Sequence, residues 1–423
     1  MRSRDNAAVA AGRARGSTEP KRLLVLGAGP AQLGTLGAAR RRGLLVVAAD
    51  RDPSAPGFAR ADRRAIVSIE DEPAIERLAR AEAVDGLVAP GTDHAVAISA
   101  RVAQRLGLPH PLDPETALLA ASRRRQRERL AFAGVPQPRS ILCRALEEAI
   151  AAAEELGLPC VVEAPDAAGE RAVALAADAH RVAAAAASAL AQARDDYCLV
   201  EELVGGRVVT VEGFVRDGEL TALALTDREE APPPAFGVPL AQLWPSTVAS
   251  DEAEGAAAVV ADAAAALGVR AGPVTAQVLL GRGEPLLAKL SARTGGGHEA
   301  ELCRVAVGVD LDDLAVGAAL GEPAGRERLD PLPLAGGACV RSLVAQPGEL
   351  LEMRGLDAAQ AVPGVRAVHA YRSPGYRFAE LRRASDRAGA VIAVGATLAE
   401  ARQSAEAAAA LVELVTEPAG ALA

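Results

Sequence analysis

The sequence has little lysine, few aromatic residues and no long apolar run, and each shortage excludes a class of structure. Aromatic residues make up 2% of the 423 residues, so the core must consist of Ala, Val and Leu. No apolar run reaches the length of a membrane span. The first 20 residues are Arg- and Ala-rich and lack the apolar core of a signal peptide. We therefore predict a cytoplasmic protein with no membrane partner and a disordered tail over residues 1–20.

Cysteine usage and net charge narrow the function classes further. The five cysteines are scattered with no CxxC pair, so neither a zinc site nor a disulfide framework is indicated. The net charge of −9 argues against nonspecific nucleic-acid binding, which needs a basic field. The basic run over residues 123–129 is a local exception, and most such runs are solvated helix faces. The cysteines are Cys143, Cys160, Cys198, Cys303 and Cys339.

The chain is long enough for two or three domains, and its pattern of expected helices and strands changes twice along the sequence. Residues 21–113 alternate apolar strands with helices, which predicts a parallel sheet with helices on both faces. Residues 114–325 mix helices with hairpins and predict an α+β unit. Residues 326–423 carry mostly short strands and a final alanine-rich helix. The expected fold class is thus α/β and α+β.

The stretch "GAGPAQLG" contains Gly27, Gly29 and Gly34 and follows the first expected strand. Asp50 ends the second strand, where a ribose-binding acid would lie in a dinucleotide-binding domain. The third glycine is displaced relative to GxGxxG, and a tight strand-to-helix turn needs glycine for structural reasons alone. An NAD-dependent enzyme using this domain therefore stays an alternative to a purely structural turn.

Nine motifs occur in an order that resembles the ATP-grasp superfamily, especially its carboxylate–amine ligases. The resemblance covers residues 21 to about 415 and implies a Rossmann-like domain over 21–113, a two-lobed ATP-grasp domain over 114–325 and a small, mostly β domain over 326–423. Such enzymes activate a carboxylate as an acyl phosphate with MgATP and pass it to an amine. The motifs are "GAGPAQLG", "FAGVPQP", "LGLPCVVE", "VEELVGG", "VTVEGFV", "GPVTAQV", "ARTGGGH", "GVDL" and "DRAGAVIAVGAT".

The resemblance assigns the nucleotide-binding positions residue by residue. The family's two phosphate-binding lysines correspond to Arg123 and Glu163, and the loop after the second retains only Gly169 and gains Glu170. The hinge that contacts adenine, partly through its backbone, corresponds to Glu201, Glu202 and Val204. The ribose-binding glutamate corresponds to Val208, which cannot accept a hydroxyl hydrogen bond.

The metal positions depart further from the family. Its two metal-binding glutamates correspond to Gln277 and Lys289, and its asparagine corresponds to Ser291. Lys289 is one of only two lysines among the 46 basic residues of the chain. The general use of arginine in this sequence therefore does not explain a lysine at this position. A pair of unit charges about 4 Å apart is worth about 4 kcal/mol at an effective dielectric of 20. We therefore expect no bound metal and no cofactor, and we predict that Lys289 pairs with Glu163 across the cleft, directly or through water or Glu202.

The other end of the expected site is retained. Arg293 matches the arginine that the family uses on the acyl phosphate or the substrate carboxylate, and it is the candidate catalytic residue. The glycines that follow keep a loop of backbone N–H groups able to receive an anion. A small carboxylate is therefore the expected ligand. The residues of this loop are Gly295, Gly296, Gly297 and His298.

Together these positions predict a catalytically impaired ligase homologue, a pseudoenzyme acting in binding or regulation, with an active ligase paralogue as a candidate partner. The first alternative is an active carboxylate–amine ligase that uses ATP and Mg²⁺ in an unusual site, with Arg123, Arg171 and Lys289 holding phosphates. The second is the NAD-dependent enzyme described above.

Overall fold

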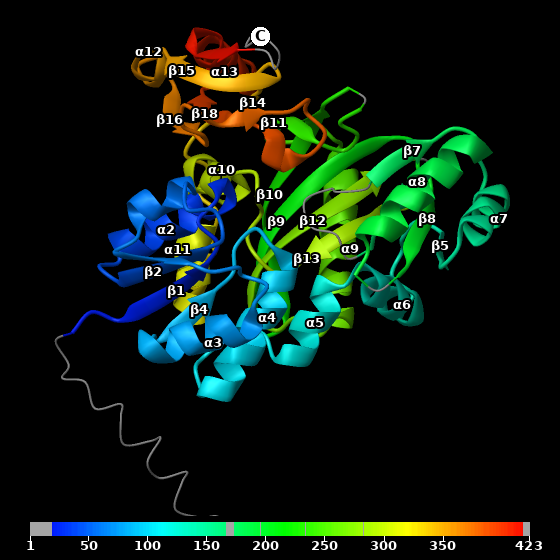
Figure 1. The fold of residues 1–423 in the computed structure, drawn as a ribbon, viewed down its shortest axis with the longest axis horizontal. Helices are drawn as coiled ribbons and strands as arrows, with labels where there is room; N and C mark the ends of the chain where they lie inside the picture. Colours follow the sequence, from blue (N-terminus) through cyan, green and yellow to red (C-terminus); the bar gives the residue numbers. More distant parts are fainter. Residues whose placement is uncertain (1–18, 166–172, 195, 233, 282, 418–423) are drawn as a thin grey trace, which may run out of the picture.

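The computed structural model describes residues 19–165, 173–194, 196–232, 234–281 and 283–417. Figure 1 shows three parts: the N-terminal unit in blue, a small lobe in green at the far side of a long curved sheet, and the C-terminal strands above both. No helix among the described residues is both long and apolar enough to cross a membrane.

The N-terminal unit contains a four-stranded sheet in the order β3-β2-β1-β4, and all its pairs are parallel, as predicted. Leu24 and Leu26 of β1 pack against helices α3 and α4, while Leu23 and Val25 face α2 and α11. Helices therefore cover both faces, although α11 comes from the central part of the chain. The elements are β1 (Arg22–Leu26), η1 (Pro30–Gln32), α2 (Leu33–Arg41), β2 (Leu45–Asp50), η2 (Pro56–Arg60), β3 (Arg63–Ile66), α3 (Glu72–Ala81), β4 (Gly86–Val88) and α4 (Asp93–Leu106).

Two helices lead into the small lobe, whose sheet has the order β5-β8-β6-β7 and is antiparallel throughout. Alanine and valine side chains of α7 and α8 pack on this sheet, and the buried core of the lobe consists of Ala, Val, Cys and Leu, as the shortage of aromatic residues requires. The elements are α5 (Pro114–Ala121), α6 (Arg123–Ala133), β5 (Ser140–Cys143), α7 (Leu146–Leu156), β6 (Cys160–Glu163), β7 (Val173–Ala176), α8 (Ala179–Gln192) and β8 (Cys198–Glu202).

The large sheet has eight strands in the order β13-β12-β9-β10-β11-β14-β18-β16. β14, which belongs to the third segment of the sequence, pairs with β11 over residues 338–341, so the sheet continues from the central unit into the C-terminal strands. The sequence pattern predicted a separate third unit because it cannot show which strands pair. The central elements are β9 (Arg207–Arg216), β10 (Glu219–Glu230), β11 (Pro239–Trp244), α9 (Ser250–Ala266), β12 (Gly272–Leu280), β13 (Leu286–Ser291), α10 (Glu299–Val307) and α11 (Leu311–Ala319).

The C-terminal segment is mostly strands, as predicted, but its last element is a strand. After α13 the chain forms β19, which pairs with β15 in a three-stranded sheet of order β17-β15-β19. The elements are η3 (Arg326–Arg328), β14 (Gly337–Leu343), β15 (Gly348–Arg354), α12 (Leu356–Gln360), β16 (Val365–Ala370), β17 (Arg377–Phe378), η4 (Ala384–Asp386), β18 (Gly389–Gly395), α13 (Leu398–Leu411) and β19 (Glu413–Glu417).

Candidate functional site

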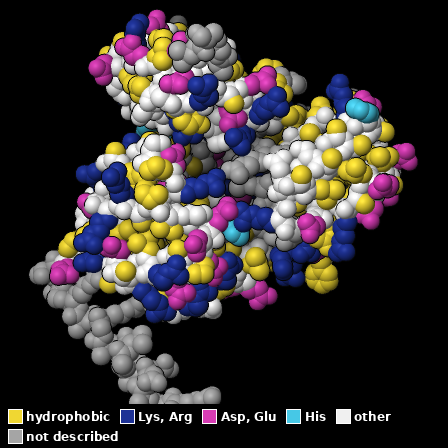
Figure 2. All heavy atoms as spheres, viewed as in Figure 1, with side chains coloured by type: hydrophobic (Ala, Val, Ile, Leu, Met, Phe, Trp, Pro, Cys, Tyr) yellow, Lys and Arg dark blue, Asp and Glu magenta, His cyan; other side chains and the backbone are white. Residues whose placement is uncertain are grey.

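Two cavities meet at Lys289, in the region where the N-terminal unit, the small lobe and the large sheet come together. Figure 2 shows a hollow there with Lys and Arg side chains on its rim. The first, the Arg123 cavity, has a volume of about 250 Å³; it is lined by Asp93, His94, Leu118, Ala121, Ser122, Arg123, Arg125, Gln126, Glu163, Ala164, Pro165, Arg194 and Lys289. The second, the glycine-loop cavity, has a volume of about 300 Å³.

The glycine-loop cavity carries more positive than negative side chains. Among the described residues, its lining includes Arg228, Lys289, Arg293 and Arg387 but a single carboxylate, that of Glu299. Uncharged polar side chains and the loop glycines form another part of the cavity wall: Gln277, Ser291, Tyr371, Gly295, Gly296 and Gly297. An anion is the ligand that such a wall favours.

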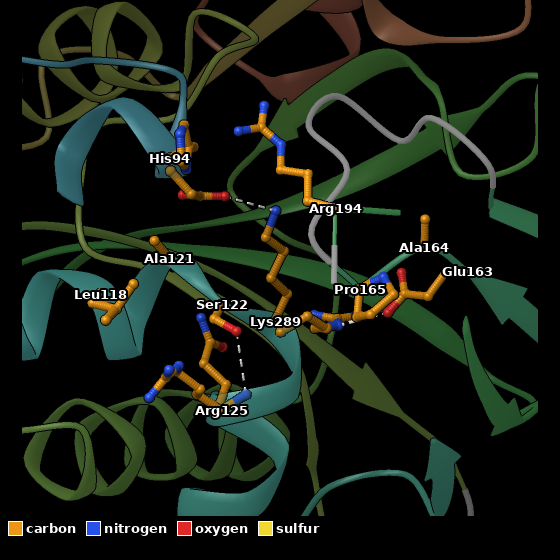
Figure 3. A pocket seen from close by; sticks show the side chains of 13 residues that line it. His94, Leu118, Ala121, Ser122, Arg125, Glu163, Ala164, Pro165, Arg194 and Lys289 are labelled. Carbon is orange, nitrogen blue, oxygen red and sulfur yellow. Dashed lines mark hydrogen bonds and ion pairs between the residues drawn. The ribbon is translucent and has the colours of Figure 1, made fainter. Parts of the chain in front are cut away.

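Asp93 is the centre of charge pairing at the junction. The Nζ atom of Lys289 lies 3.0 Å from Asp93 Oδ2, and the Nε atom of Arg293 lies 2.6 Å from Asp93 Oδ1. Figure 3 shows Lys289 in the middle of the Arg123 cavity, with its dashed line to this carboxylate. Burial acts to raise the pKa of Asp93, but the charges of Arg293 and Lys289 outweigh it and hold the pKa well below its usual value. Asp93 is therefore a fixed anion between two cations.

The prediction that Lys289 pairs directly with Glu163 is wrong, although both residues line the same cavity. Lys289 instead forms an ion pair with Asp93, at the start of α4. Glu163 pairs with Arg123 of α6, whose Nε atom lies 2.8 Å from Glu163 Oε1. The ATP-grasp resemblance assigns roles only to positions that the family uses, and Asp93 is not one of them. A signal existed, because Asp93 follows the carboxyl end of the parallel strand β4, where sites gather in such sheets.

Arginine side chains of α6 fill the space between the lobes. Arg127 binds Glu201 with Nη2 2.6 Å from Oε1, and it also donates to the carbonyls of Leu287 and Ala288 on β13. Arg123 approaches Glu201 at 3.8 Å as well. These groups are almost completely buried, so part of the predicted solvated helix face is instead an internal ion-pair network. Its members neutralise one another at the positions assigned to phosphate and adenine binding.

The three metal positions lie on adjacent strands of the large sheet. Gln277 of β12 is opposite Lys289 of β13, and Ser291 is opposite Thr275 two residues further along. Their side chains offer an amide, an ammonium and a hydroxyl. Mg²⁺ is held in proteins chiefly through carboxylates and substrate phosphates, so these residues do not fit it.

The glycine loop lies against the N-terminal unit, and close packing around it leaves no room for larger residues at two of its three glycines. A Cβ atom at Gly295 would lie 2.5 Å from Glu299 Oε2, and one at Gly297 would lie 2.8 Å from Gln242 Nε2. The N–H of Gly297 already donates to Glu299 Oε2 at 2.5 Å. Arg293 and the three glycines line the cavity, and the charge partner of Arg293 is Asp93. Anion binding by the loop stays a prediction.

Other predicted site residues lie apart from the two cavities. His298 is buried behind the loop at φ 68° and contacts Glu301 and Tyr371. Glu202 pairs with the exposed Arg139 at the outer end of β8. Val204 follows β8 in the loop to β9, and its adenine contact stays a prediction.

The predicted phosphate loop lies outside the described residues, and the first glycine motif has a structural explanation. Gly169, Glu170 and Arg171 lie outside the described residues. The carboxylate of Asp50 accepts hydrogen bonds from the N–H groups of Ala28 and Asp52, so it braces the first glycine turn. A Cβ atom at Gly27 would lie 2.7 Å from the side chain of Gln32, which packs into that turn. This geometry favours the structural explanation of the turn over dinucleotide binding.

Replacing Asp93 with asparagine should lower the free energy of unfolding by about 2–3 kcal/mol, because it leaves the nearly buried Arg293 without its carboxylate partner. Lys289 contributes less, since its side chain is 37% exposed and such pairs are worth about 1 kcal/mol or less. Urea unfolding at pH 7 would measure both Asp93→Asn and the comparison variant Lys289→Ala. A loss below about 0.5 kcal/mol for Asp93→Asn would contradict this account.

The comparisons with known proteins agree with this architecture. Residues 122–323 match the model of the carbamoyl-phosphate synthase L chain, ATP binding domain, and residues 341–417 match L-amino acid ligase C-terminal domain 2. The chain is 30% identical over 299 residues to the uncharacterized protein y4rH of Sinorhizobium fredii, covering 70% of this chain and 60% of that protein. It is 31% identical over 213 residues to the formate-dependent phosphoribosylglycinamide formyltransferase of Solidesulfovibrio magneticus, covering 48% of this chain and 50% of that enzyme. The matches thus span half to three-fifths of these relatives.

Solved structures match over almost the whole chain. The L-amino acid ligase from Bacillus licheniformis has a TM-score of 0.80 at 19% identity and covers 95% of this chain and 100% of its own. Phosphoribosylglycinamide synthetase from Anaerococcus prevotii has a TM-score of 0.73 at 20% identity and covers 94% and 100%. At these identities the likeness concerns the fold alone. The two matching family models assign the chain to the ATP-grasp superfamily, and the solved structures agree with that fold.

Proposed function

We propose that this ATP-grasp protein does not carry out MgATP-driven ligation and instead binds a small carboxylate or phosphate in the glycine-loop cavity. One observation carries the proposal: Arg123 pairs with Glu163 inside the chain, where a nucleotide site needs cations free for phosphate. The side chains of Gln277, Lys289 and Ser291 add no carboxylate for Mg²⁺. A regulatory role beside an active ligase paralogue belongs to the same proposal and accounts for a ligase fold without its metal site.

The retained end of the site supports the ligand class. Arg293 is held by Asp93 with its Nη1 donating to the carbonyl of Thr294 at 2.9 Å, so the guanidinium has a fixed orientation at the cavity wall. Arg228, Lys289 and Arg387 extend the positive wall beyond it. A carboxylate entering this cavity would meet several cations and the amide groups of the loop.

Calorimetry with the full chain tests the proposal with four probes: MgATP, ATP with EDTA, succinate and inorganic phosphate. We expect no binding of MgATP at millimolar concentration and saturable binding of succinate or phosphate, because Arg228, Lys289, Arg293 and Arg387 together give the glycine-loop cavity a positive wall. Arg293→Gln should weaken anion binding at least tenfold, whereas Arg216→Gln, at the end of β9, should leave it unchanged. A micromolar dissociation constant for MgATP, or no binding of either anion, would overturn the proposal.

An active ligase remains the second candidate function, favoured by the matches to ATP-grasp and L-amino acid ligase domain models. In that case Arg123, Arg125, Arg194 and Lys289, which line one cavity, would hold the phosphates. The variant Gln277→Glu with Lys289→Glu separates the two candidates. It should create a Mn²⁺ site detectable by electron paramagnetic resonance if the wild-type positions are impaired. An active ligase would instead lose nucleotide binding when Lys289 becomes an acid.

A further inference from the structure

Behind the glycine loop lies a buried cluster of two histidines, a glutamate and a tyrosine. His298 Nδ1 lies 2.9 Å from Glu301 Oε2, and His369 Nε2 lies 2.8 Å from the same oxygen. The two imidazole rings stack with their centroids 4.6 Å apart, and His298 Nε2 lies 2.6 Å from the hydroxyl of Tyr371. Each of the four residues is less than 10% exposed. None of the assignments made from the ATP-grasp resemblance explains why two histidines converge on one carboxylate oxygen.

The fold brings the cluster together from distant parts of the chain. His298 precedes α10 in a left-handed conformation, and Glu301 lies three residues later in the first turn of that helix, so the two side chains share one side. His369 belongs to β16, at the far edge of the large sheet. The cluster therefore joins the end of the glycine loop to the C-terminal strands.

The geometry points to a divalent transition-metal site, with Zn²⁺ as the expected ion and His298, Glu301 and His369 as its protein ligands. One ligand atom from each residue lies within 4.8 Å of the other two. Zn²⁺ commonly takes two histidines and a carboxylate and leaves a fourth position to water. Bonds of about 2.1 Å in tetrahedral geometry place ligand atoms about 3.4 Å apart, so the nitrogens need to retreat from Glu301 by only about half an ångström.

Tyr371 is placed to support a metal-bound His298. A histidine that binds a metal through one nitrogen usually donates its other ring N–H to a fixed partner. With the metal on Nδ1, the N–H at Nε2 would donate to the Tyr371 hydroxyl. This hydroxyl is buried and lies within hydrogen-bonding distance of Nε2, so it is placed to accept that N–H. Tyr371 also lines the glycine-loop cavity, which gives the cluster an entry side for the ion and its water.

The charges around the cluster permit the ion but limit its affinity. Both histidines converge on the same oxygen of Glu301, so this carboxylate is placed to bind a cation between them. Arg387 opposes the ion, since its positive side chain lines the same cavity as Tyr371, on the side from which the ion would enter. Arg387→Gln should therefore tighten metal binding several-fold.

The test uses the full chain, stripped with EDTA and then dialysed against ZnCl₂ or CoCl₂. We expect one Zn²⁺ per chain by elemental analysis after gel filtration, a Zn²⁺-dependent rise in melting temperature, and Co²⁺ absorption bands of a four-coordinate site. His369→Asn should weaken Zn²⁺ binding more than 100-fold. Tyr371→Phe should weaken it about 10- to 100-fold, as is typical of a supporting residue.

The matched control is His180→Asn, because His180 is an exposed histidine on α8, far from the cluster in the sequence. This variant should bind Zn²⁺ like the wild type, and circular dichroism would establish that each variant is folded. Absence of stoichiometric Co²⁺ and Zn²⁺ binding by the wild-type chain would overturn the inference whatever the variants do. Unchanged binding by a folded His369→Asn variant would overturn it as well, since the ion would then lie elsewhere.

Discussion

Replacing Arg127 with methionine should lower the free energy of unfolding by about 3–5 kcal/mol, the usual cost of breaking a buried ion pair from one side. The Arg127 side chain is 6% exposed, and its partner Glu201 is buried as well. Methionine keeps much of the side-chain volume but leaves Glu201 with only the longer contact to Arg123 at 3.8 Å. It also removes the donors to the Leu287 and Ala288 carbonyls, so β13 loses two hydrogen bonds to α6 and keeps those that Gln126 makes with Leu290. Urea unfolding at pH 7 would measure the loss.

The adjacent glutamate provides a matched control. Glu202 pairs with Arg139, whose side chain is 61% exposed, so Arg139→Met should cost less than about 1 kcal/mol. The double variant Arg127→Met with Glu201→Leu should recover at least half of the loss, because neither charge is then buried alone. Similar small losses from Arg127→Met and Arg139→Met would contradict the view that the buried network holds the lobes together.

Local sequence patterns predicted the elements well and the pairing of charges poorly. The glycine at 107 ends α4 in a left-handed conformation, and the alternation before it predicts the parallel sheet. Motif order found several of the residues that line the cavities, because Arg123, Glu163 and Lys289 occupy fixed places on their helix or strand and Arg293 lies just after β13. Which cation meets which anion depends on side chains from other units, and no local pattern carries that information.

Two consequences of long-range packing show this limit. Asp93 belongs to the N-terminal unit but forms ion pairs with both Lys289 and Arg293, which are about 200 residues away along the chain. Tyr371 and His369 come from the third segment and meet His298. The domain boundaries at residues 113 and 325 remain predictions, because helix α11 of the central segment packs on the parallel sheet of the first unit. The assignment of that unit as Rossmann-like also remains a prediction.

Asp312 links the first and central units and should make stability depend on pH. It lies in the first turn of α11 and is 5% exposed, with Thr35 of α2 donating to its Oδ1 at 2.5 Å. A Cβ atom at Gly34 would overlap its carboxylate, which gives the third glycine of the first motif a packing role. Burial raises the pKa of Asp312 to about 7, with further raising by the charges of Glu301 and Asp310, while Thr35 and Arg41 act to lower it.

The sign of the pH effect follows from this raised pKa. Between about pH 4 and pH 7 the folded chain keeps a proton on Asp312 that the unfolded chain releases, so the stability from this group falls as pH rises. The slope approaches 1.4 kcal/mol per pH unit, and the total approaches about 4 kcal/mol by pH 7. Asp312→Asn cannot titrate and can still accept from Thr35. Its advantage over the wild type should therefore grow from pH 5 to pH 7 and level off above pH 7.

Urea unfolding of the wild type and Asp312→Asn at pH 5, 6, 7 and 8 measures this growing difference. Asp313→Asn serves as the control, because Asp313 is the next residue on the same helix but is partly exposed and pairs with Arg42 and Arg328. Its difference from the wild type should not grow in favour of the variant over this range. A constant offset between Asp312→Asn and the wild type would mean that the buried carboxyl group does not titrate there. The contact between α2 and α11 would then depend on packing and the Thr35 hydrogen bond, with no contribution from a proton held at the interface.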